Sequence, residues 1–83
     1  MATGLARDNR SLRGGIDLGG TKIQAVVITR THRVVGEARV PTPVDGGPEA
    51  VAAAMAEALG AAASTAGVAT RLLAGVGVGS AAH

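Results

Sequence analysis

The chain has 83 residues, of which 47% are hydrophobic and none aromatic, and its formal net charge at pH 7 is +2. This length allows one small domain, and the large side chains that dominate core burial are missing. The lack of cysteine excludes a disulfide framework and a cysteine-based zinc site in this chain. The mild charge without interleaved aromatic residues argues against nucleic-acid binding. No apolar run suits a membrane span or a secretory leader, so a soluble cytoplasmic protein is expected.

The first segment, residues 1–13, is polar and shows no periodic apolar pattern. Such a segment is typical of a disordered tail. The remaining residues, 14–83, carry equal numbers of acidic and basic side chains and are expected to form one partial domain.

The most informative stretch joins two predicted strands, at residues 13–18 and 22–29, and combines a carboxylate, two glycines, a hydroxyl and an ammonium. In order, its residues are Asp17, Leu18, Gly19, Gly20, Thr21 and Lys22. The glycines make the tight connection between the strands, because they lack a Cβ and tolerate positive φ.

Each side chain of this stretch suits the binding of a phosphate with its metal ion. The backbone N–H groups around Gly19 and Gly20 can close on an anion. The hydroxyl of Thr21 adds a donor, and the ammonium of Lys22 adds a positive charge. Asp17, just before the bend, is placed to hold a hydrated divalent cation such as Mg²⁺. The stretch therefore predicts a phosphate-and-metal corner on a β-turn.

Two familiar phosphate-binding motifs do not fit this stretch. Gly15-x-x-x-x-Gly20-Thr21-Lys22 is close to a Walker A loop, but threonine and lysine are in the wrong order. A Walker A loop also opens a helix, whereas the residues that follow here predict a strand. The sequence contains no Gly-x-Gly-x-x-Gly dinucleotide fingerprint. A plain glycine-rich hairpin with a surface aspartate remains the alternative.

A polar turn leads to a third predicted strand at residues 33–40. Gly36 inside this strand marks a candidate bulge. Pro41 and Pro43 end the strand, since proline cannot donate to a ladder hydrogen bond. His32, in the turn, is assigned no role, because a lone turn histidine is usually solvated.

A helix is predicted to follow, with Pro48 at its first position and Gly67 as its stop. Its apolar residues recur at helical spacing; they are Val51, Met55, Leu59 and Ala62 or Ala63. Residues 72–78 read as a fourth strand, apolar on both faces and therefore buried and parallel to the first. Three antiparallel strands, a crossover helix and a returning parallel strand predict an α/β fold, the opening of a ribonuclease-H-like domain.

The stretch from Gly15 to Ile23 resembles the first phosphate motif of the ROK family (repressors, open reading frames and kinases), which belongs to the superfamily of sugar kinases, heat-shock proteins and actin. Weaker matches follow in the right order and spacing, so the resemblance covers residues 14–79. They lie at 34–37, 41–43, 47–51 and 75–79. Bacterial glucokinases look most similar.

The resemblance implies an actin-like ATPase domain and transfer of the ATP γ-phosphate to the 6-hydroxyl of a glucose-like hexose. ATP and Mg²⁺ would be the cofactors, and ATP and a hexose the partners. Asp17 would assist Mg²⁺, through water, while the residues that follow would cradle phosphate: Gly19, Gly20, Thr21 and Lys22. Full-length relatives are often homodimers.

The sequence departs from the family pattern after the fourth predicted strand. Family members typically continue Gly-x-Gly-x-Pro-Gly-x-Val-Asp, whereas this chain has Ser80 after its glycines and ends at His83. The family's catalytic base, sugar ligands and zinc motif would lie beyond residue 83. We therefore expect the amino-terminal part of a sugar kinase, truncated and inactive alone. The alternatives are a non-catalytic remnant of a truncated gene or a fragment of a ROK repressor, although residues 1–13 are too few for the repressor's DNA-binding domain.

Overall fold

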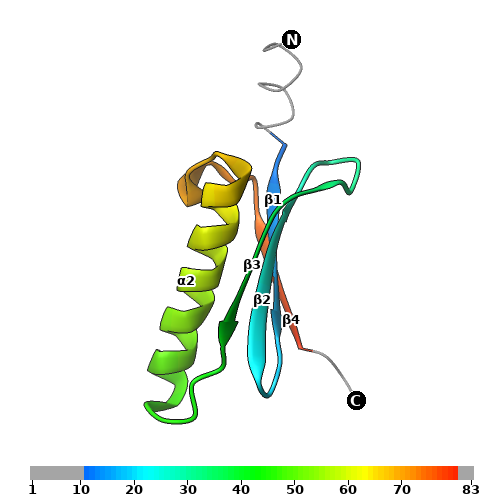
Figure 1. Ribbon diagram of the computed structural model, residues 1–83. Helices are drawn as coiled ribbons and strands as arrows, with labels where there is room; N and C mark the ends of the chain where they lie inside the picture. Colours follow the sequence, from blue (N-terminus) through cyan, green and yellow to red (C-terminus); the bar gives the residue numbers. More distant parts are fainter. Residues whose placement is uncertain (1–10, 81–83) are drawn as a thin grey trace.

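One mixed sheet with a single long helix against one face makes up the part of the chain that the computed structural model describes, residues 11–80 (Figure 1). The elements are β1 (Arg13–Leu18), β2 (Lys22–Ile28), β3 (Val34–Pro41), α2 (Gly47–Ala66), the 3₁₀ turn η1 (Thr70–Leu72) and β4 (Val76–Ser80). The strand order is β3-β2-β1-β4. Strands β1, β2 and β3 pair antiparallel, and β4 returns parallel to β1. The predicted topology is confirmed.

The core lies between the sheet and α2. Along β2 the side chains of Ile23, Ala25 and Val27 are fully buried, while the residues between them face the other side of the sheet and are half-buried. The helix buries a stripe of small residues with one leucine; the stripe consists of Ala54, Ala58, Leu59, Ala62 and Ala63. Val51 and Met55 pack at the margin of the core, as their helical spacing predicts.

Gly36 lets the helix approach β3 closely. A Cβ at this position would lie 2.1 Å from the backbone oxygen of Ala62. The pairing of β2 with β3 also shifts here, from Val27 opposite Gly36 to Ile28 opposite Val34. The predicted bulge is therefore confirmed, and the close approach of α2 explains why glycine is required at Gly36.

Glycines mark both ends of α2. Gly46 precedes the helix with φ of 96°, and Gly67 follows it with φ of 79°, both in the left-handed region that favours glycine. The N–H of Gly67 donates to the backbone oxygen of Ser64 at 3.0 Å, which confirms the predicted stop. The helix begins at Gly47, one residue before Pro48.

The prediction of a buried fourth strand over residues 72–78 was wrong in its bounds and in its burial. Residues Thr70–Leu72 form η1, and β4 begins at Val76. Val76 is 46% exposed and Val78 is 56% exposed. The cause is the position of β4 at the sheet edge, because α2 packs across β3, β2 and β1 (Figure 1). All five residues of β4 are exposed.

Leu12 was predicted to lie in a disordered tail, but its side chain is buried in the core. It is 1% exposed, and its backbone oxygen accepts a hydrogen bond from the N–H of Ala74 at 2.7 Å. A single apolar side chain before β1 therefore belongs to the core, although residues 1–13 show no periodic pattern. The rest of the predicted tail, residues 1–10, lies outside the described residues, as do residues 81–83. Across residues 11–80, no helix has the length and apolar character that a membrane crossing requires.

Candidate functional site

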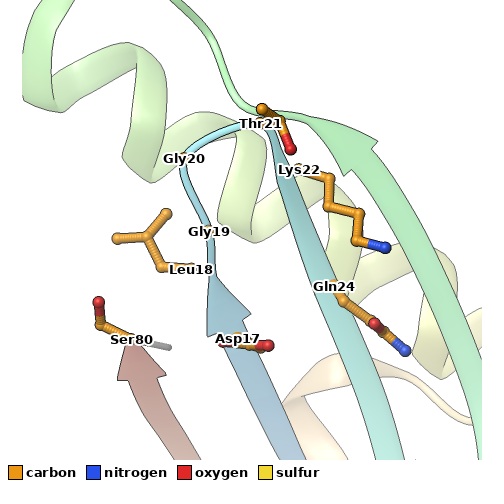
Figure 2. Close-up of a pocket in the computed structure, with 8 residues that line it drawn as sticks. All are labelled: Asp17, Leu18, Gly19, Gly20, Thr21, Lys22, Gln24 and Ser80. Carbon is orange, nitrogen blue, oxygen red and sulfur yellow. The ribbon is translucent and has the colours of Figure 1, made fainter. Parts of the chain in front are cut away.

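The turn between β1 and β2 lies at the end of the sheet where β4 also ends (Figure 1). It borders a cavity of about 350 Å³ (Figure 2). The residues that line it are Asp17, Leu18, Gly19, Gly20, Thr21, Lys22, Gln24 and Ser80. All five residues predicted to bind phosphate or metal are therefore brought to one cavity. Their proximity follows from their neighbouring positions in the sequence.

The two glycines of the turn serve different steric needs. The N–H of Gly19 donates to the backbone oxygen of Lys22 at 3.0 Å, and a Cβ on Gly19 would lie 2.8 Å from that same oxygen. A Cβ on Gly20 would meet nothing within 4 Å. Among the described glycines only Gly46, Gly47 and Gly67 have positive φ, so the expected left-handed glycines in this turn are not found. At Gly19 a side chain would clash with the backbone of Lys22, so glycine is required there. At Gly20 a Cβ would have room.

Asp17 is exposed on the face of the sheet opposite α2. In the sheet it pairs with Gln24 on one side and with Gly79 on the other. Because Gly79 has no side chain, the carboxylate remains open to solvent on that side. The amide nitrogen of Gln24, on β2, donates a hydrogen bond to the carboxylate of Glu37 on β3.

The donor set at this turn fits a hydrated Mg²⁺ ion. Within residues 11–80 no group of three or more His, Cys, Asp or Glu side chains comes together to hold a metal ion. Magnesium keeps several of its waters, and proteins commonly bind it through one or two carboxylates together with the substrate's phosphates. A single exposed carboxylate, Asp17, beside a cavity lined by Thr21 and Lys22 meets that requirement.

Gln24 and Ser80 line the cavity but were not predicted from the sequence. Gln24 follows Lys22 by two residues on β2, so both side chains extend from the same face of the strand (Figure 2). Ser80 is the last residue of β4 and pairs with Leu18. The strand period could have revealed Gln24, whereas Ser80 requires the register between β1 and β4.

The model of the ROK family matches residues 13–83. This chain belongs to the ROK family. A ROK family glucokinase from Streptomyces griseus, solved in complex with glucose and AMPPNP, is 33% identical, with a TM-score of 0.70. The match covers 84% of this chain and 20% of the glucokinase chain, so the chain spans about a fifth of that protein's length. The predicted resemblance to the ROK family is confirmed.

The fold also matches a more distant protein. The Acidaminococcus fermentans (R)-2-hydroxyglutaryl-CoA dehydratase component A is 17% identical, with a TM-score of 0.61. That match covers 84% of this chain and 25% of the other, and at this identity it shows the fold alone. No curated protein matches the chain. The structure corresponds to the amino-terminal part of the actin-like ATPase fold found in the ROK glucokinase, as predicted.

Proposed function

We propose that these residues form the phosphate- and metal-binding corner of an ATP-dependent sugar kinase of the ROK family. The observation that carries this proposal is the cavity at the β1–β2 turn. It joins a carboxylate, two glycines, a hydroxyl and an ammonium within the segment that matches the family.

Each residue has a separate task in this proposal. Backbone N–H groups of the turn, at Gly20 in particular, donate to phosphate oxygens, and Lys22 places its positive charge beside them. Thr21 adds a hydroxyl donor. Asp17 accepts hydrogen bonds from the waters of a bound Mg²⁺ ion. That ion, when present, neutralises charge on the phosphates during phosphoryl transfer.

The glucose and AMPPNP in the Streptomyces griseus glucokinase support ATP as the phosphoryl donor and a hexose as the acceptor. Phosphoryl transfer also needs a positioned acceptor hydroxyl and a catalytic base. We propose that both are supplied by parts of a ROK kinase beyond these 83 residues, and that the chain alone binds nucleotide without turning it over. We also propose that the complete kinase is a homodimer, as the family resemblance implies.

The test is Mg·ATP binding by the 83-residue chain, measured by isothermal titration calorimetry. We expect weak binding that is lost in Asp17→Ala and in Lys22→Ala. The first variant removes the carboxylate that holds the hydrated Mg²⁺ ion, and the second removes the positive charge beside the phosphates. Glu49→Ala is the matched control, since Glu49 is an exposed carboxylate in the first turn of α2, away from the cavity. No binding by the intact chain at millimolar nucleotide would overturn the proposal.

A further inference from the structure

Thr42, the first residue after β3, holds the β1–β2 turn at two points. Its hydroxyl donates to the backbone oxygen of Gly19 at 2.8 Å. Its backbone N–H donates to the oxygen of Thr21 at 3.0 Å. The two contacts bind both ends of the three-residue connection between β1 and β2. Thr42 itself is half-buried and does not line the cavity.

The contact with the Gly19 oxygen determines the direction of the next N–H group. A trans peptide is planar, so its C=O and N–H point in opposite directions. With the Gly19 C=O held toward Thr42, the N–H of Gly20 points away from Thr42. Within residues 11–80 this N–H donates to no protein acceptor, and a Cβ built on the exposed Gly20 would meet nothing within 4 Å. It is therefore available to an anion.

The neighbours of Thr42 restrict its own backbone. Pro41 has a fixed φ, and Pro43 confines the preceding residue to extended conformations. The hydroxyl is therefore presented from a stiff segment to a glycine turn that would otherwise have wide conformational freedom. In Pro41-Thr42-Pro43, the prolines limit the backbone and the threonine makes the contact.

We propose that Thr42 is a positioning residue that pre-organises the β1–β2 turn for phosphate; this inference rests on the proposed function of the turn. Without the hydroxyl, the Gly19–Gly20 peptide can rotate and place its carbonyl oxygen, instead of an N–H, toward the anion. Donors that are already aligned bind the anion without a reorganisation cost.

The experiment compares Thr42→Val with Thr42→Ser in the 83-residue chain. Valine keeps the shape and removes the donor, whereas serine keeps the hydroxyl. For Thr42→Val we expect about five- to tenfold weaker Mg·ATP binding, the loss of one hydrogen bond. We also expect a lower ¹⁵N order parameter at Gly20 without nucleotide, moving from the rigid toward the flexible range. Thr42→Ser should retain both properties.

Thr65→Val is the matched control, because the Thr65 hydroxyl also donates to a backbone oxygen, that of Ala61 at 3.0 Å on α2. It should leave both the affinity and the order of Gly20 unchanged. An unchanged order parameter in Thr42→Val, or equal losses in Thr42→Ser, would overturn the inference. A slowly exchanging Thr42 hydroxyl proton in the unmodified chain supports it without any variant, and rapid exchange contradicts it.

These measurements separate the inference from the proposed function. If the unmodified chain binds no Mg·ATP, the proposed phosphate site is overturned. The order parameter of Gly20 in Thr42→Val then decides alone whether Thr42 orders the turn.

Discussion

The two turns at opposite ends of β2 use threonine hydroxyls in different ways. In the β2–β3 turn, the hydroxyl of Thr29 accepts hydrogen bonds from the N–H groups of Thr31 at 3.3 Å and of Arg33 at 3.1 Å. The N–H of His32 donates to the backbone oxygen of Thr29 at 2.9 Å. The N–H groups of Thr31, His32 and Arg33 are thus paired within the turn itself, and Thr29 is only 4% exposed.

The β1–β2 turn has one hydrogen bond of its own, from the N–H of Gly19 to the oxygen of Lys22, and is also held from outside. Thr42 lies 23 residues along the chain from Gly19, and its hydroxyl donates to a carbonyl of the turn rather than accepting from its N–H groups. The N–H of Gly20 is left without a protein acceptor within the described residues. In the β2–β3 turn a threonine hydroxyl accepts from two N–H groups of the turn, whereas in the β1–β2 turn a threonine hydroxyl holds a carbonyl and leaves the N–H of Gly20 able to donate to an anion.

Among the variants that test this difference between the turns, Gly19→Ala should have the largest effect on stability and binding. The new Cβ would lie 2.8 Å from the backbone oxygen of Lys22, so the backbone of the turn must shift. We expect a loss of about 2 kcal/mol in the free energy of unfolding, typical of overpacking, together with loss of Mg·ATP binding. Urea denaturation followed by circular dichroism measures the first and calorimetry the second. A variant as stable as the unmodified chain would show that the turn adapts freely.

Gly20→Ala should separate binding from stability. A Cβ here meets nothing within 4 Å, and Gly20 does not have positive φ, so the free energy of unfolding should change by less than about 0.5 kcal/mol. The methyl group stands beside the N–H that faces the anion, and we expect about tenfold weaker Mg·ATP binding, equivalent to about 1.4 kcal/mol. Unchanged affinity would mean that the anion does not approach Gly20.

Thr29→Val should have the smallest effect, and on stability alone. Removing the hydroxyl leaves the N–H groups of Thr31 and Arg33 without this acceptor. Because the turn is otherwise exposed, water can replace part of the loss, and we expect about 1 kcal/mol of destabilisation. Mg·ATP affinity should remain as in the unmodified chain under conditions where both are folded. A large loss of affinity would contradict the separate roles of the two turns.

The gathering of the candidate site residues at one cavity could be predicted from sequence because these residues are contiguous. Asp17 and Lys22 lie at the two ends of one tight turn, so no long-range register is needed to bring them together. The sheet topology could also be predicted, because the strand alternation around Ile23 and the helical spacing around Leu59 are strong local patterns.

The parts that could not be predicted depend on distant segments. The exposure of Val78 follows from where α2 stops covering the sheet, which no local pattern encodes. Ser80 reaches the cavity through the parallel register of β4 with β1. Thr42 reaches Gly19 only because β3 pairs with β2 in the observed register. Local apolar content indicates a strand, but burial and contact depend on its neighbours.

The most direct measurement is a titration of the ¹⁵N-labelled chain with Mg·ATP, followed by amide chemical shifts at both turns. We expect saturable shifts at Gly20, Thr21 and Lys22, with the amides of Thr31 and Arg33 unmoved. A control titration with adenosine, which lacks phosphate, should leave both turns unmoved. Shifts confined to other residues, or equal shifts at both turns, would contradict a phosphate site at the β1–β2 turn.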